Sequence, residues 1–185
     1  MENYTTRGFY QQIKNTDLAR LHLWEVYLPG RFGEDSRFYI ESTNWPEKSL
    51  GTIPVPFLGF EYKLPGTTKF SGTWNINVRA DMNYTIRDEF NDWLDEIYNY
   101  NTGASETFGR MEDASLTLLD NKLRKTKEIK MVGCFPVSVG DIQFVQDQGE
   151  TVVVFPVTLA FQWWELDRQA NQGSVISLDI PNPFS

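Results

Sequence analysis

Residues 69–98 read KFSGTWNINVRADMNYTIRDEFNDWLDEIY, and this stretch decides the fold. From Trp74 to Ala80 apolar and polar residues alternate, which is typical of a strand that buries one face against a core. After a polar turn the apolar spacing changes to three and four residues, which predicts an amphipathic helix at about 85–98. Thr85 is the predicted cap of this helix. The helix residues expected to pack on the core are Ile86, Phe90, Trp93, Leu94 and Ile97.

Several other segments have the branched and aromatic composition of strands. Segment 134–146 contains Pro136 and Gly140, which favour a bend or an edge strand. The proline-rich residues 44–58 are predicted to form an irregular connection, and the strands 57–64 and 69–81 that follow are predicted to pair as a hairpin. The predicted strands are 21–28, 38–43, 57–64, 69–81, 116–119, 125–132 and 151–165.

These elements indicate a mainly β fold, an antiparallel β-barrel or sandwich of about seven or eight strands with one flanking α-helix at about 85–98. A chain of 185 residues fits a single domain, 1–185, which can bury a core of ordinary size. Residues 1–20 lack a sustained period and are predicted to be an irregular N-terminal arm. Residues 167–185 are polar and are predicted to be a C-terminal tail.

The composition excludes several classes of protein. A net charge of −8 disfavours non-specific binding to nucleic acid, because backbone phosphates require a basic surface. One cysteine, Cys134, gives no internal disulfide, and no apolar run is long enough to suggest a signal peptide or a membrane span. We therefore expect no membrane association.

Reactive groups are too sparse to suggest catalysis. His22 is the only histidine and falls within a predicted strand, so it is expected to be structural and no histidine-based metal cluster can form. The sequence also lacks a glycine-rich phosphate loop. We predict that the protein is not an enzyme and has no catalytic residues, no cofactor and no metal site.

Two charged clusters could contact partners. The first is an acidic face on the predicted helix, which is either a docking surface for a basic partner or simply a solvated face. The second is a basic run that is either a contact between subunits or a solvated strand edge. The acidic residues are Asp88, Asp92, Asp95 and Glu96, and the basic residues are Lys122, Arg124, Lys125, Lys127 and Lys130.

The order of these elements resembles the tail tube protein family of contractile-tailed bacteriophages. The resemblance covers about residues 20–166 and is most specific where the alternating strand runs into the helix, at Asp81, Tyr84, Glu89, Phe90 and Trp93. The segments that carry it are LWEVYLP, FYIES, MNYTIRDEFNDWLDEI, GCFPVSVGDIQFV and VVVFPVTLAFQWWEL.

This resemblance implies a structural virion protein, a subunit of hexameric rings that stack into the hollow inner tube of a contractile tail. Its implied partners are itself, the tail sheath protein, and the baseplate and tail terminator proteins. Phage DNA would pass through the lumen without specific binding, which an acidic subunit favours. The implied location is the virion tail, assembled in the host cytoplasm. In this interpretation the acidic helix face meets the sheath and the basic run lies between subunits.

Two alternatives remain open at this stage. One is a related tube of the same fold, either a baseplate-proximal tube initiator or a subunit of a secretion-system tube. The other is a monomeric ligand-binding β-barrel, which the mid-chain position of the helix disfavours.

Overall fold

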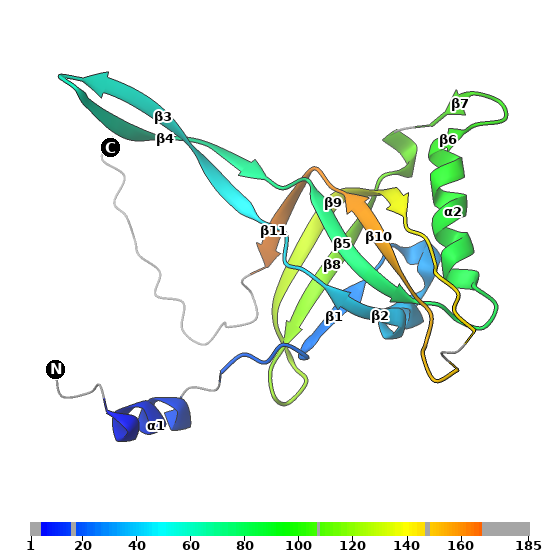
Figure 1. The fold of residues 1–185 in the computed structure, drawn as a ribbon, viewed down its shortest axis with the longest axis horizontal. Helices are drawn as coiled ribbons and strands as arrows, with labels where there is room; N and C mark the ends of the chain where they lie inside the picture. Colours follow the sequence, from blue (N-terminus) through cyan, green and yellow to red (C-terminus); the bar gives the residue numbers. More distant parts are fainter. Residues whose placement is uncertain (1–4, 16–17, 107, 147–148, 168–185) are drawn as a thin grey trace, which may run out of the picture.

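The computed structural model describes residues 5–15, 18–106, 108–146 and 149–167, and its centre is one antiparallel sheet of seven strands. The strands of this sheet are β1 (Trp24–Tyr27), β2 (Ile40–Thr43), β5 (Thr73–Arg79), β8 (Glu112–Leu119), β9 (Lys125–Val139), β10 (Val154–Ala160) and β11 (Trp163–Asp167). Their order is β1-β8-β9-β10-β5-β2, and β11 pairs with β9 beside β10. The predicted mainly β, antiparallel architecture is confirmed (Figure 1).

The long strand β9 holds the two halves of the sheet together. Its first half pairs with β8 and β11, and its second half pairs with β10. Gly133, at φ +65°, lies where β9 changes partners, in a left-handed conformation that glycine adopts without strain. Beyond Cys134, β9 pairs only with β10, and that pairing has a register irregularity next to Pro136, which agrees with the predicted bend or edge strand as far as Val139.

The core is formed by buried residues on one face of the sheet together with the inward residues of the helix at Thr85–Ile97. In β5 the predicted alternation is present, with Trp74, Ile76 and Val78 buried and the residues between them exposed. The predicted strand 151–165 is two strands, because the chain leaves β5 near Phe161 and continues along the first half of β9. One face of β10 is buried, with Phe155, Val157 and Leu159 in the core.

Helix α2 (Thr85–Ile97) covers one flank of the sheet (Figure 1). The predicted cap, Thr85, does not cap it. Asp81 accepts hydrogen bonds from the amides of Ile86 and Asn83, both at 3.3 Å, because Tyr84 takes a left-handed conformation that turns the chain into the helix. Partial burial raises the pKa of Asp81, but hydrogen bonds from the Thr85 hydroxyl and the Ile86 amide outweigh it, so this pKa lies below its ordinary value.

A second α-helix, α1 (Thr6–Asn15), corrects the predictions of one helix and of an irregular segment 1–20. Thr5 caps it by accepting a 3.1 Å hydrogen bond from the Gly8 amide. The helix lies apart from the sheet, at the lower left of Figure 1. The predicted tail 167–185 lies outside the described residues except for Asp167.

Residues 44–58 are not an irregular connection, because most of them form β3 (Lys48–Phe57), which pairs with β4 (Phe60–Phe70). The predicted pairing of 57–64 with 69–81 is therefore wrong. Pro54 and Pro56 are tolerated because each strand of a two-stranded ribbon has one edge without a partner, where no amide hydrogen is needed. The remaining elements are η1 (Gly30–Phe32), η2 (Glu34–Tyr39), β6 (Tyr98–Asn99), β7 (Ala104–Ser105) and η3 (Phe108–Arg110).

Candidate assembly surfaces

The inward face of α2 is built into the core. Ile86, Phe90 and Trp93 are buried, and the indole Nε1 of Trp93 donates a 2.8 Å hydrogen bond to the carbonyl oxygen of Arg110. Leu94 and Ile97 are half-buried at the margin of the same stripe. Phe32 from η1 packs on Phe90 and Trp93, so this stripe also holds η1 in place.

The outward face of α2 carries the predicted acidic cluster, but its members differ. Asp88, Asp92 and Asp95 are exposed and form no ion pair within the described part of the chain. Glu96 instead accepts a 3.0 Å hydrogen bond from Arg31 and forms an ion pair with Arg110 at 3.2 Å. Glu96 is therefore committed to the subunit's own structure, and the three aspartates form the free acidic face.

The predicted basic run lies on the turn between β8 and β9 and on the start of β9. Three of its five cations are paired within the chain: Arg124 with Asp120, Lys125 with Glu128, and Lys130 with Asp113. Hydrogen bonds from the amide and guanidinium of Arg124 hold the pKa of Asp120 below its ordinary value. Lys122 and Lys127 have no such partner among the described residues.

The β3–β4 hairpin carries an exposed apolar surface outside the core. It projects from the sheet (Figure 1). Three cross-strand pairs place six apolar side chains on the same face of the ribbon. The pairs are Ile53 with Leu64, Val55 with Tyr62 and Phe57 with Phe60, with exposed fractions from 39% to 74%. An isolated two-stranded ribbon is marginally stable in water, so an uncovered apolar face indicates a surface that another molecule covers.

The turn at the tip of this hairpin has an unusual residue, leucine, at a position with positive φ. The two-residue turn uses Leu58 at φ +48° and Gly59 at φ +82°. Asparagine or glycine is usual at the first position, because a branched side chain is strained there. Leu58 is also 88% exposed, so it gains nothing from its own subunit. Periodicity and composition did not predict this surface; the Leu-Gly turn between two alternating segments is the signal that could have found it.

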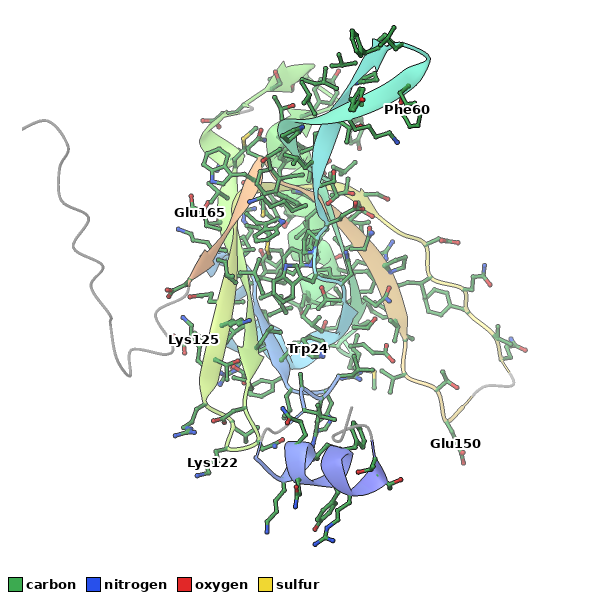
Figure 2. All side chains as sticks on the ribbon, turned by 90° about the vertical axis from the view of Figure 1, so that its left-hand side faces the viewer. Trp24, Phe60, Lys122, Lys125, Glu150 and Glu165 are labelled. Carbon is green, nitrogen blue, oxygen red and sulfur yellow. The ribbon has the colours of Figure 1, made fainter. Side chains whose placement is uncertain are left out.

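The turn between β8 and β9, which carries the start of the basic run (the basic turn), and the apolar β3–β4 hairpin lie at opposite ends of the subunit. Figure 2 shows Phe60 near the upper end and Lys122 near the lower end. Between them the outward face of β2, β5 and β10 carries uncharged polar side chains that bond to each other, together with Glu41 and Arg79. Thr158 donates to Asn75 at 3.0 Å, and Asn77 donates to Ser42 at 2.8 Å.

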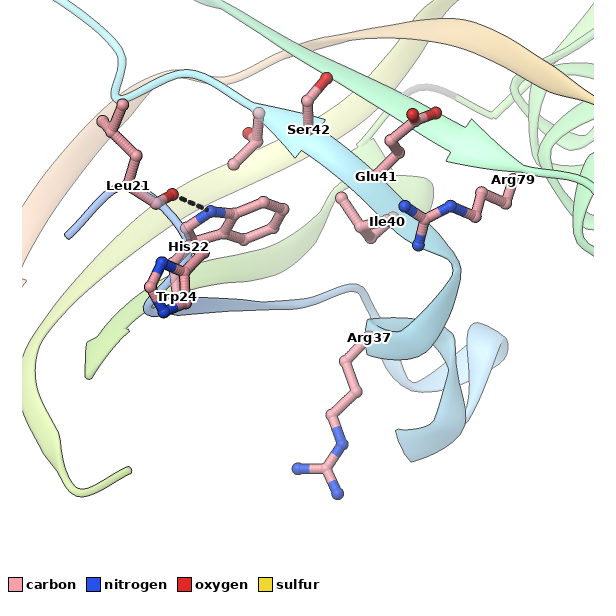
Figure 3. Close-up of a pocket in the computed structure, with 9 residues that line it drawn as sticks. Leu21, His22, Trp24, Arg37, Ile40, Glu41, Ser42 and Arg79 are labelled. Atoms are coloured by element: carbon pink, nitrogen blue, oxygen red, sulfur yellow. Dashed lines mark hydrogen bonds between the residues drawn. The ribbon is translucent and has the colours of Figure 1, made fainter. Parts of the chain in front are cut away.

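The pockets contain no reactive arrangement among the described residues. A cleft of about 430 Å³ near the start of β1 is lined by His22, which lies in a turn before β1 and not within a strand as predicted (Figure 3). Arg37 in this cleft bonds to the Tyr27 hydroxyl at 3.2 Å, and His22 has no hydrogen-bond partner in the described ranges. Burial raises the pKa of the Cys134 thiol to about 12, so this thiol is not a nucleophile at neutral pH.

Metal and membrane sites are also missing from the described part of the chain. No group of three His, Cys, Asp or Glu side chains there could hold a metal ion. None of its helices is long and apolar enough to cross a membrane. The fold and these surfaces define a class of protein: a strand-rich subunit whose distinctive features are exposed surfaces suited to self-association.

The chain belongs to the phage tail tube protein family, whose model matches residues 24–167. Members of this family are structural components of the virion tail, so the protein is not an enzyme, and a monomeric ligand-binding barrel is excluded. Tail tube protein gp19 of Enterobacteria phage T4 is 27% identical over 165 residues, which covers 86% of this chain and 96% of gp19.

Solved structures of similar fold come from contractile injection systems. One is a chain of the sheath-tube complex of an extracellular contractile injection system, PVC, in the extended state; it has a TM-score of 0.62 and 17% identity, covering 85% of this chain and 97% of the other. Another belongs to the six-fold symmetrised baseplate of the anti-feeding prophage, with a TM-score of 0.61 and 11% identity, covering 82% and 96%.

Proposed function

We propose that this protein forms hexameric rings that stack into the inner tube of a contractile phage tail, through which DNA passes during infection. The observation that carries the proposal is the uncovered apolar face of the β3–β4 hairpin, because burying it against another subunit stabilises both the hairpin and the contact. Membership of the tail tube family supports the ring, as does the six-fold symmetry of the anti-feeding prophage baseplate, which contains a chain of similar fold.

The arrangement of surfaces supports head-to-tail stacking. The apolar hairpin and the basic turn lie at opposite ends, so the same two surfaces can meet repeatedly between successive rings (Figure 2). Such a heterologous contact does not close on itself along the axis and generates a filament. Hexamers with this geometry form a tube of indefinite length until another protein ends it.

The outward face of β2, β5 and β10 suits the wall of a conduit, because most of its side chains are uncharged and its cation, Arg79, lines the same cleft as Glu41 (Figure 3). Its amide and hydroxyl groups bond to each other, as in the pairs Asn75–Thr158 and Asn77–Ser42, and offer few free donors to phosphates. Affinity for the DNA backbone comes mainly from cations, so this wall would let DNA pass without specific binding.

Helix α2, which carries the free acidic face, flanks the sheet (Figure 1), and in this arrangement its exposed aspartates face the sheath. The tube would also contact a baseplate at one end and a terminator at the other, and would assemble in the host cytoplasm. A tube initiator or a secretion-system tube has the same fold and remains the second candidate.

Negative-stain microscopy of the purified protein tests the proposal. We expect rings of six subunits and tubes whose length grows with protein concentration. A monodisperse monomer by light scattering at high concentration would contradict self-assembly. A defined single ring that never elongates, but that nucleates tubes of another protein, would favour the initiator.

A further inference from the structure

Helix α1 has an apolar side with no partner in its own subunit. Phe9, Tyr10 and Ile13 follow one side of the helix, and Phe9 and Tyr10 are 63% and 68% exposed. Arg7 and Lys14 are seven residues apart and border this apolar side, and α1 contains no acidic residue. Among the described residues, no α1 side chain belongs to the core. The helix is therefore amphipathic, basic and uncovered.

A groove with the complementary character lies between η2 and the start of α2. Its volume is about 440 Å³, and its apolar lining comes from Phe32, Tyr39 and Ile86. Asp35 and Glu89 also line it, and neither carboxylate forms an ion pair or hydrogen bond within the described ranges. The one cation of the groove, Arg31, is already engaged by Glu96 and Glu112. An apolar floor with free acidic groups suits a basic amphipathic helix.

We propose that α1 of one subunit docks in this groove of a neighbouring subunit, with Phe9 and Ile13 on the apolar floor and Arg7 and Lys14 beside Asp35 and Glu89. Its own groove is a poor match in position, because α1 lies at the lower left of Figure 1 and α2 at the right. The lining of the subunit's own groove includes no residue of α1, so we assign this groove to α1 of an adjacent subunit. This inference rests on the proposed self-assembly.

Cysteine cross-linking between two differently substituted chains tests the exchange. Ile13→Cys and Tyr39→Cys are purified separately, mixed, assembled and oxidised, and the products are separated on a non-reducing gel. Native Cys134 is fully buried and does not compete. We expect a disulfide-linked dimer of one chain of each kind. Ile13→Cys mixed with Thr158→Cys, on the outward face of β10, is the matched control and should give no dimer.

The outcomes separate this inference from the proposed function, because tubes are scored by microscopy before oxidation. Tubes that form without the dimer overturn the inference and leave the tube proposal intact. A double Ile13→Cys, Tyr39→Cys variant that forms only an intrachain disulfide also overturns it, since α1 would then occupy its own groove. Wild-type protein that forms no tubes overturns the proposed function.

Reversing the charges on α1 and in the groove tests the docking independently of the cysteine variants, with the polymerisation rate as the measurement. Arg7→Glu with Lys14→Glu should slow polymerisation about fivefold at low salt, the scale expected for a pair of exposed ion pairs. Adding Asp35→Lys and Glu89→Lys should restore the rate, while the groove substitutions alone should be slow. Circular dichroism checks that each variant is folded. Equal rates for all variants would overturn the docking.

Discussion

The indole nitrogen of Trp93 and the backbone carbonyl of Arg110 are joined by a 2.8 Å hydrogen bond. This bond ties the middle of α2 to the chain that leads into β8. The guanidinium of Arg31 lies 5.0 Å from the centre of the same indole and bonds to Glu96, one helical turn further on. Trp93 therefore links the core of the subunit to the ion pairs that fix the outer side of α2.

Trp93→Ala should lower the free energy of unfolding by about 3–5 kcal/mol, the usual cost of removing a large buried aromatic side chain. Trp93→Phe should cost less, because it retains most of the packing and loses about 1 kcal/mol for the hydrogen bond to Arg110. Denaturant unfolding of the unassembled subunit measures both. Trp163→Ala, at a 44% exposed position, is the control. A melting temperature for Trp93→Ala equal to the parent's would show that the indole contributes nothing.

Leu58→Asn should separate folding from assembly. Asparagine tolerates the left-handed conformation of this turn, so the melting temperature of the subunit should stay the same or rise slightly. Tube formation should weaken, because the exposed leucine would no longer contact the next subunit. Gly59→Asn, at the second turn position, keeps Leu58 and serves as the control. Tubes of normal length and yield from Leu58→Asn would remove the hairpin tip from the contact.

Lys122→Glu combined with Lys127→Glu should slow polymerisation, most strongly at low salt, where the Debye length exceeds about 10 Å. These two lysines are the members of the basic run without a partner in the described chain. Arg124→Gln is the matched comparison, because Arg124 is already paired with Asp120. If light-scattering time courses coincide for all three proteins at every salt concentration, the basic run is a solvated turn.

Asp88→Lys combined with Asp92→Lys should leave tube formation unchanged but stop the sheath from assembling around the tube. Each exposed ion pair contributes only about 0–1 kcal/mol, so many such pairs hold the sheath and still release it. Glu96→Lys should behave differently and lower the melting temperature, because it places a cation beside Arg31, whose side chain is only 17% exposed. Sheathed tails at normal yield from the double variant would argue against α2 as the docking surface.

Acidification should loosen the start of α2. The pKa of Asp81 is lowered in the folded state, so its stabilising contribution is present above the unfolded value of about 3.9 and is lost as pH falls through the folded value. Asp81→Asn should therefore lower the melting temperature at pH 7 and flatten its decline below pH 4. Asp95→Asn, on the exposed side of α2, controls for the loss of one charge. Identical pH profiles for Asp81→Asn and the parent would exclude this role.

Local sequence patterns determined the elements that meet the core. The alternation from Trp74 to Val78 and the helical spacing of Ile86, Phe90 and Trp93 each record burial on one face, because the apolar side chains repeat with the period of the backbone. The family was also recognisable from the order of these elements. The scarcity of reactive groups around His22 and Cys134 could likewise be predicted from composition.

Tertiary structure alone decided which surfaces remain free. The sequence shows Glu96 and Asp92 as equivalent acids on one helix, yet only Glu96 meets Arg31, 65 residues away, because the fold brings η1 beside α2. The β3–β4 hairpin was not predicted from the sequence, because its prolines suggest a loop. Prolines fit in this hairpin because each of its two strands has one edge without a hydrogen-bonding partner. Ion pairing and edge pairing depend on contacts between distant segments, and local periodicity carries no record of such contacts.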